Sequence, residues 1–181
     1  GDEGSWFHLS PGYKTKADGD RVCYGDTVSF INVKFSNSLH VSEAVVKSKR
    51  LHPYVEQLRE VNAATEPTAF KIRPYAVHQS IQPYGSEKLL KAGDTLVFRH
   101  RATESLLTCS VGEQGQLRYM HMPRTNKHQE PSSNALWKIE ATEVDWAGQL
   151  MRVGGDSQYR IKHMATAKYL AAFPTGECDA N

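Results

Sequence analysis

A candidate ligand-binding stretch with several cationic side chains lies between residues 118 and 128. It comprises Arg118, His121, Arg124, Lys127 and His128. A phosphorylated ligand needs several cationic donors that converge from loops, and arginine suits this task because its planar guanidinium donates two parallel hydrogen bonds. The stretch contains a proline, which is typical of a loop. The sequence therefore indicates a basic loop that could hold an anion. The alternative is a solvated, positively charged loop.

Other residues with chemical potential form no recognisable catalytic or metal-binding motif. The eight histidines include no His-Glu-x-x-His pattern, and the three cysteines include no Cys-x-x-Cys pattern. Gly-x-Ser-x-Gly and glycine-rich phosphate loops are also absent from the sequence. We therefore expect no enzyme, no metal site and no cofactor. His100 and His163 share a repeat position, described below, and we expect both to be structural, each donating to a nearby backbone group.

Cysteine usage and charge limit the functional class. Cys23, Cys109 and Cys178 are odd in number and widely spaced, which predicts free thiols in a reducing compartment. The 22 Lys and Arg residues against 20 Asp and Glu give a net charge of +2, so a strongly basic nucleic-acid binder is not expected. There is no apolar run near the length that spans a bilayer, so we expect no direct membrane insertion of this chain.

Internal repeats indicate which elements must position these side chains. Residues 25–30 (GDTVSF) match residues 93–98 (GDTLVF), and residues 100–107 (HRATESLL) match 163–170 (HMATAKYL). Apolar residues alternate within each copy, as in a half-buried strand, and the preceding Gly-Asp pair is turn chemistry. The alternating pairs are Val28 and Phe30, Leu96 and Phe98, and Tyr159 and Ile161.

A second recurring element ends each unit with an aromatic residue. Trp6, Phe70 and Trp137 return at the same phase of the repeat, so we expect all three to be buried at equivalent core positions. Repeated strands without a strong helical period predict an all-β fold of the closed, trefoil type. The excursion over residues 43–68 is interpreted as a surface insertion with a short helix starting at Pro53. Residues 78–88 are polar and turn-rich, and are the best linker candidate.

Several segments together resemble one protein family. They are residues 2–7 (DEGSWF), the Gly-Asp pairs at 19–20 and 25–26, and residues 39–42 (LHVS), 132–137 (SSNALW) and 163–172 (HMATAKYLAA). In their order and spacing they resemble the MIR-repeat region of intracellular calcium-release channels, closest to the inositol trisphosphate receptors. The ryanodine receptors are the sister family, and residues 146–152 lean toward their pattern.

The resemblance implies a domain organisation and a location. Such channels carry MIR repeats in two consecutive β-trefoils on the cytosolic face of the endoplasmic reticulum membrane. By this analogy residues 1–77 would end a first trefoil, 78–88 would be a linker, and 89–181 would open a second trefoil. The alternative is one three-repeat trefoil over 1–181. The implied partners are neighbouring domains of the same subunit within a tetramer, with no nucleic acid.

The resemblance also implies a ligand. In the family, the second trefoil and a following helical domain clamp inositol trisphosphate, which could therefore bind the full receptor. Counting back from the strand at Trp137, Arg124 matches the final arginine of the family's Arg-Thr-Thr-Gly-Arg run, whereas residues 120–123 do not match it. Arg124 and Lys127 are the predicted ligand-binding residues of a regulatory, ligand-sensing module. The alternative function is a lumenal MIR module of a glycosylation or chaperone protein that binds sugar or protein.

Overall fold

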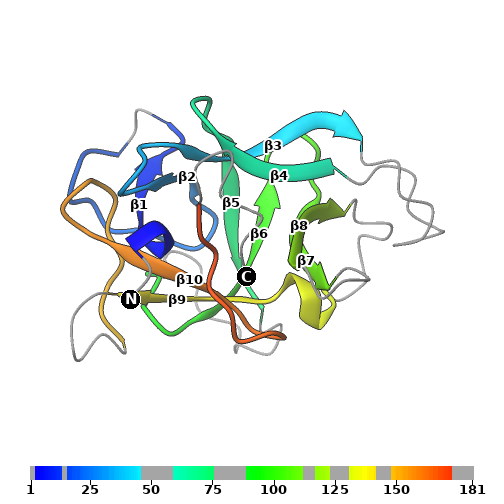
Figure 1. The fold of residues 1–181 in the computed structure, drawn as a ribbon. Coiled ribbons are helices and arrows are strands. Elements are labelled where there is room, and N and C mark those ends of the chain that lie inside the picture. Colours follow the sequence, from blue (N-terminus) through cyan, green and yellow to red (C-terminus); the bar gives the residue numbers. More distant parts are fainter. Residues whose placement is uncertain are drawn as a thin grey trace.

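The computed structural model describes residues 3–13, 16–45, 59–75, 89–111, 117–122, 131–141 and 148–172. Strands dominate these ranges, together with two short 3₁₀ helices (Figure 1). The elements are η1 (Glu3–Ser5), β1 (Phe7–Pro11), β2 (Thr27–Asn32), β3 (Ser38–Val45), β4 (Arg59–Ala64), β5 (Phe70–Pro74), β6 (Thr95–His100), β7 (Leu106–Val111), β8 (Leu117–Met122), η2 (Ser133–Ala135), β9 (Trp137–Ala141) and β10 (Tyr159–His163). The predicted all-β fold is confirmed. The predicted helix after Pro53 and the predicted linker lie outside the described residues.

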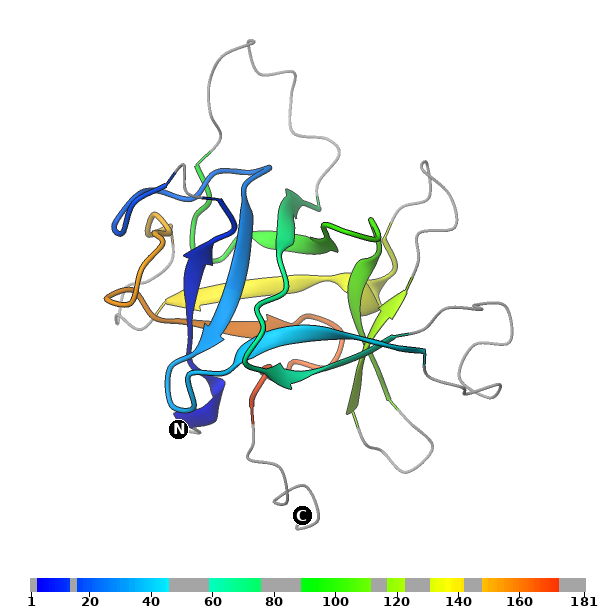
Figure 2. The same ribbon diagram turned by 90° about the horizontal axis from the view of Figure 1, so that it is seen from above.

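The ten strands form one antiparallel sheet that closes on itself. Its order is β1-β10-β9-β6-β5-β2-β3-β4-β8-β7, and β1 also pairs with β2. That extra pairing joins the ends of β1-β10-β9-β6-β5-β2 into a barrel, which removes its open edges. The hairpins β3–β4 and β7–β8 extend from the barrel (Figure 2). Strands from residues 1–77 and from 89–181 both belong to this barrel.

Three equivalent units build the barrel: unit 1 holds β2–β5, unit 2 holds β6–β9, and unit 3 combines β10 with β1. Within each unit, the glycine of the turn before the first strand donates its N–H to the last strand. These bonds run from Gly25 to the Ile72 carbonyl (2.8 Å), from Gly93 to Ile139 (2.8 Å) and from Gly154 to Leu9 (2.9 Å). The third bond joins the turn before β10 to β1 and so closes the ring.

A ring of backbone hydrogen bonds lies where the three units meet. Val22 donates to the Met151 carbonyl at 2.9 Å, Met151 to Leu90 at 3.0 Å, and Leu90 back to Val22 at 2.8 Å. All three side chains are fully buried at 0% exposure. Because each unit satisfies a backbone group of the next, no unit can leave the ring without exposing polar groups of the others.

The core is built from the alternating apolar residues of the barrel strands. Phe30 packs against Phe70 and Phe98 at ring-centroid distances of 5.8 and 4.9 Å, and Phe98 lies 6.3 Å from Trp137. Phe70 and Trp137 are 0% exposed, as predicted. Offset and tilted ring pairs of this kind add to the stability gained from apolar burial.

The predicted burial of Trp6 is wrong by one residue. In the paired strands Val28 faces Phe70, Leu96 faces Trp137 and Tyr159 faces Phe7. Phe7, 2% exposed, therefore holds the equivalent core position of unit 3. Trp6 precedes the strand and is half-buried, with its ring 5.2 Å from the Arg160 guanidinium. Adjacent aromatic residues make the sequence repeat ambiguous here, and only the strand register resolves it.

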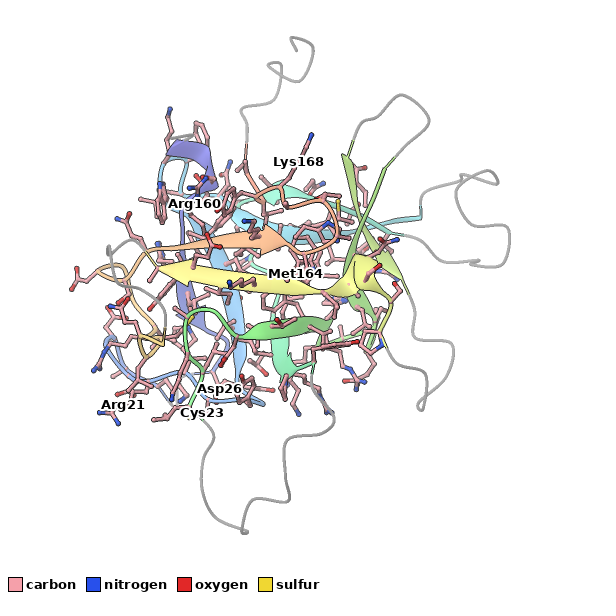
Figure 3. All side chains as sticks on the ribbon, turned by 90° about the horizontal axis from the view of Figure 1, so that it is seen from below. Arg21, Cys23, Asp26, Arg160, Met164 and Lys168 are labelled. Atoms are coloured by element: carbon pink, nitrogen blue, oxygen red, sulfur yellow. The ribbon has the colours of Figure 1, made fainter. Side chains whose placement is uncertain are left out.

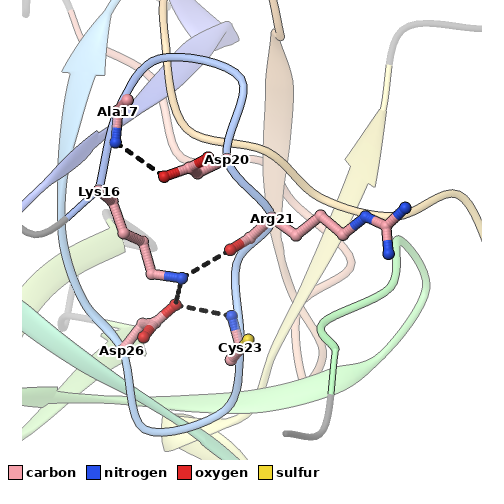
Figure 4. Close-up of polar contacts among 6 residues, drawn as sticks. All are labelled: Lys16, Ala17, Asp20, Arg21, Cys23 and Asp26. Carbon is pink, nitrogen blue, oxygen red and sulfur yellow. Dashed lines mark hydrogen bonds and ion pairs between the residues drawn. The ribbon is translucent and has the colours of Figure 1, made fainter.

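The Gly-Asp pairs form turns, as their chemistry predicts. In each, the aspartate Oδ2 accepts the backbone N–H of the third residue before it: Asp20 from Ala17 (2.8 Å) and Asp26 from Cys23 (2.7 Å). Lys16 ties the two turns together, because its Nζ lies 2.9 Å from Asp26 Oδ2 (Figure 4). Asp94 accepts the Lys91 N–H in the same way at 3.0 Å.

Candidate functional site

The predicted ligand-binding residues Arg124 and Lys127 lie outside the described residues, and so does His128. The flanking elements are described. The chain leaves β8 at Met122, which faces Leu106 of β7, and returns just before η2 and β9. One residue earlier on β8, His121 pairs with Arg59 of β4. The described elements on either side of residues 123–130 are therefore β8, which pairs with β4, and the short helix η2 before β9.

Basic groups gather on this side of the barrel. Burial lowers the pKa of His100, and the nearby Arg59 and His40 lower it further. A lowered pKa keeps this imidazole neutral at pH 7, so among these three side chains Arg59 carries the permanent charge. His100 Nδ1 lies 2.9 Å from Thr103 Oγ1. The described part of this face thus brings the Arg59 guanidinium close to the His100 imidazole.

His163 is structural, as predicted. It is 1% exposed, its Nε2 lies 3.0 Å from the Asn134 carbonyl, and its Nδ1 lies 3.0 Å from Thr166 Oγ1. A carbonyl only accepts, so Nε2 must carry the proton and Nδ1 accepts from Thr166. Burial lowers the pKa of His163, while the bond to Asn134 opposes that shift. The imidazole therefore fixes η2 to β10 in its neutral form.

The cysteines and histidines of the described ranges form no metal site. No group of three or more His, Cys, Asp or Glu side chains in those ranges could hold an ion. Cys23 and Cys109 are buried free thiols, and Cys178 lies outside the described residues. Burial raises the pKa of Cys109 to about 11, which keeps it as the unreactive thiol at neutral pH.

The outer face of β9 and β10 carries an arginine held between two aromatic rings. The Arg160 guanidinium lies 3.6 Å from the centroid of Tyr169 and 5.2 Å from that of Trp6. Tyr169 donates to Glu140 Oε2 at 2.7 Å. Figure 3 looks onto this face, with Arg160 beside β10. Sequence reasoning missed this cluster, although the alternation along β10 already places Arg160 outward. The guanidinium thus contacts aromatic rings from the first and the last of the described segments.

A cavity of about 310 Å³ opens between the end of β9 and the segment that precedes β10. Its polar lining comes from Gln149, Arg152, Asp156, Ser157 and Gln158. Sequence reasoning also missed this site, because these residue types in a turn-rich segment read as ordinary solvated loop. The signal that could have revealed it is the longer connection between the turn glycine and the strand in unit 3.

Comparisons with known proteins agree with this architecture. Residues 1–81 match the family model described as inositol 1,4,5-trisphosphate/ryanodine receptor, and residues 88–177 match the MIR domain. The chain is 29% identical over 187 aligned residues to the inositol 1,4,5-trisphosphate receptor itr-1 of Caenorhabditis elegans. That alignment covers 97% of this chain and only 6% of the receptor's length.

Solved structures share the fold at low identity. The SDF2-like protein from Arabidopsis thaliana superposes with a TM-score of 0.58 at 18% identity, covering 83% of this chain and 77% of that one. The protein O-mannosyltransferase Pmt1-Pmt2 complex of S. cerevisiae, bound to the sugar donor, gives a TM-score of 0.60 at 15% identity, covering 90% of this chain and 23% of the other. At such identities the likeness concerns the fold alone.

Proposed function

Because the chain belongs to the MIR-repeat region of the inositol trisphosphate and ryanodine receptor family, we propose that it is a non-catalytic regulatory and ligand-sensing module of an inositol trisphosphate receptor-like calcium-release channel. The observation that supports this proposal is that a receptor family model and the MIR domain match consecutive parts of one chain. A model specific to the receptors covers the first part, and the more widely distributed MIR domain covers the second.

The proposal puts the module on the cytosolic face of the endoplasmic reticulum membrane. Its partners there are the neighbouring domains of its own subunit, within a tetrameric channel. The similarity to a receptor of which this chain spans 6% supports a role as one part of a much longer polypeptide. Within the described ranges, no helix is long and apolar enough to cross a bilayer.

We further propose that the isolated chain forms one closed trefoil over 1–181. The ring of Val22, Leu90 and Met151 supports this reading, because it takes one residue from each unit and includes both sides of residues 78–88. In the other reading, with parts of two trefoils, strands of 1–77 and 89–181 would complete separate barrels with other segments of the parent protein.

The proposed contacts to inositol trisphosphate are Arg124 and Lys127. Support comes from the match of Arg124 to the family run and from Arg59, which pairs with His121, three residues before Arg124 in the sequence. In the resembled receptors a helical domain supplies the other half of the clamp, so the chain alone leaves the phosphates mostly solvated. We expect titration calorimetry at low salt to give a dissociation constant weaker than about a micromolar.

Two variants make that experiment decisive. Arg124→Ala should abolish whatever binding is seen, whereas Arg73→Ala, which removes an exposed arginine of β5, should leave it unchanged. Equal binding by wild type and Arg124→Ala would refute the loop assignment. Tight binding that disappears in Arg124→Ala would instead show a complete site within the chain.

A lumenal MIR module that binds sugar or protein is the second candidate, favoured by the fold likeness to the SDF2-like and O-mannosyltransferase structures. Selective permeabilisation of the plasma membrane distinguishes the cytosolic channel module from the lumenal one. An epitope placed in this chain within the full parent protein should be reached by antibody once the plasma membrane alone is opened. Access only after the endoplasmic reticulum is opened would refute the channel proposal and support the lumenal one.

A further inference from the structure

Positive charge is concentrated on the outer face of β9 and β10. Alternation along the strands turns Lys138 and Glu140 of β9 outward, and Arg160 and Lys162 of β10, since the residues between them are buried. Lys168 is exposed at the edge of this face (Figure 3). The face therefore carries four cations and one carboxylate, a local net charge of +3 that exceeds the +2 of the whole chain.

Two of these lysines lie directly opposite each other in the sheet. Lys162 pairs with Lys138 in the antiparallel register, and the uncharged Thr95 of β6 faces Lys138 on its other side. Like charges at opposed positions lower the stability of a sheet. The core does not require this pair, because it is built from the buried residues that alternate with the lysines. Such an arrangement favours a partner that brings negative charge to the face.

Arg160 gives the same face a rigid anchor. Its guanidinium lies 3.6 Å from the ring centroid of Tyr169 and 5.2 Å from that of Trp6. Across the strands it faces Glu140, which accepts the Tyr169 hydroxyl at 2.7 Å. Tryptophan, tyrosine and arginine are the residue types that most often dominate the binding energy of protein interfaces. Because the two rings already hold the guanidinium, little side-chain entropy remains to be lost on binding.

The turn that follows β10 adds an apolar side chain beside the lysines. Met164, two residues after Lys162, is 42% exposed. Its N–H donates to the Leu136 carbonyl at 2.9 Å, and the His163 N–H donates to the Lys168 carbonyl at 2.8 Å. These bonds fix the backbone of the turn, so Met164 and Lys168 keep their places at one end of the face (Figure 3). Methionine is enriched at protein interfaces, where its flexible thioether adapts to a partner.

We propose that the β9–β10 face binds an acidic segment of a protein partner. The face is defined by Lys138, Arg160, Lys162, Met164, Lys168 and Tyr169. Carboxylates of the segment meet the three lysines, and an apolar side chain of the same segment packs on Met164 and the Tyr169 ring. A lipid surface matches the face less well, because Glu140 lies among the cations and repels anionic headgroups. This inference goes beyond the proposed function, since the face lies outside residues 118–128 and is available in either compartment.

The proposal is tested on the full chain with a fluorescein-labelled peptide of four Asp-Glu-Leu repeats, followed by fluorescence anisotropy. We expect a dissociation constant of about 10–100 µM in about 20 mM salt, weakened at least about fivefold in about 150 mM salt because the attraction is largely Coulombic. In ¹H–¹⁵N NMR spectra the peptide should shift amides of residues 137–141 and 159–172. A peptide of four Asn-Gln-Leu repeats is the uncharged control. Equal binding of the two peptides, or shifts elsewhere on the barrel, would overturn the proposal.

Two double variants that remove the same charge separate this face from the net charge of the chain. Lys138→Gln/Lys162→Gln should weaken peptide binding about five- to twentyfold. Lys71→Gln/Arg73→Gln removes two cations from β5, which β6 separates from β9, and should change binding less than about twofold. Met164→Ser should weaken it about two- to fivefold. Well-dispersed spectra verify that each variant is folded. Equal weakening by the two double variants would show a non-specific charge effect and refute the assignment.

Vesicles distinguish a protein partner from a membrane surface. The chain is sedimented with phosphatidylcholine vesicles that contain about 30% phosphatidylserine, in about 150 mM salt. We expect the chain to stay in the supernatant under these conditions. Sedimentation that Lys138→Gln/Lys162→Gln abolishes, without binding of the acidic peptide, would show that the face meets anionic lipid and would overturn the proposal.

Discussion

At the scale of single residues, His163 makes stability depend on pH. Burial holds its pKa below the usual 6.5 in the folded protein, and the same direction applies to His100 and His8. Below pH 6.5 the unfolded chain therefore binds more protons than the native one, and the free energy of unfolding falls as pH falls. Stability should be full above pH 6.5 and decline through the lowered folded pKa values.

The residue at the equivalent position of unit 1 suggests a substitution that tests this pH dependence. Asn32 occupies the position of His163 in the repeat and bonds backbone groups without titrating. We expect His163→Asn to flatten the fall of the denaturant midpoint between about pH 6.5 and 5, and His163→Asn/His100→Asn to flatten it further. A double variant with the wild-type pH dependence would contradict the assignment.

Trp137 tests the core at the same scale. It is 0% exposed, donates from Nε1 to the Leu107 carbonyl at 3.0 Å, and its ring centroid lies 4.8 Å from that of His163 with the two rings tilted at 51°. We expect Trp137→Ala to lower the free energy of unfolding by about 3–5 kcal/mol. Trp137→Phe keeps an aromatic ring but leaves the Leu107 carbonyl without its donor. It should lower the free energy of unfolding by about 1–3 kcal/mol. Trp6→Ala, at a half-buried position, is the control and should cost less than Trp137→Ala in chemical denaturation.

The sequence predicts the role of a residue where the repeats can be aligned without ambiguity, because equivalent positions then share one environment. The matching of 100–107 with 163–170 was enough to predict the structural role of His163, and the returning aromatic predicted Trp137 and Phe70 in the core. Trp6 could not be assigned correctly, because Phe7 beside it fits the same pattern. The position of Asp156 and Gln149 beside one cavity was beyond prediction, since it depends on how the turn before β10 folds against the end of β9.

At the scale of elements, the turns before the strands depend on backbone conformation. Gly25 has φ of +94°, and a Cβ there would meet no heavy atom within 4 Å, so only the backbone conformation demands glycine. Gly25→Ala should therefore cost about 1–2 kcal/mol. Gly155 has equally open surroundings but no positive φ, and Gly155→Ala should be neutral or slightly stabilising. Equal thermal shifts for the two variants would show that φ is not the cause.

Element types were predicted well where strands alternate and poorly where pairing is long-range. The alternation at 28–30, 96–98 and 159–161 correctly marks β2, β6 and β10. β4 carries no such pattern: its residues are mostly partly or fully exposed, with Val61 buried. Its strand conformation comes from pairing with β3 and with β8. Pairing with distant strands leaves no pattern in the sequence of β4 itself. The sequence alone therefore indicated only a surface insertion.

At the scale of the whole molecule, the three-unit ring predicts a single cooperative unit. Leu90 lies in the ring at 0% exposure, bonded through its backbone to both Val22 and Met151. We expect Leu90→Ala to lower the free energy of unfolding by about 2–5 kcal/mol. The loss should reach every unit equally, because the units share one core and one set of backbone bonds.

Hydrogen exchange measured as a function of denaturant concentration can report the loss of stability separately for each unit. In the wild-type chain, the most protected amides of β2, β6 and β10 should exchange with the same free energy of opening, and in Leu90→Ala all three should fall together. Val33→Ala, at an exposed position before β3, should leave protection nearly unchanged. If residues 1–77 and 89–181 instead belong to separate barrels, Leu90→Ala should weaken β6 and β10 while β2 keeps its protection. Parallel loss in all three strands is the result that the closed ring requires, since Val22 of unit 1 accepts the Leu90 N–H and donates to Met151.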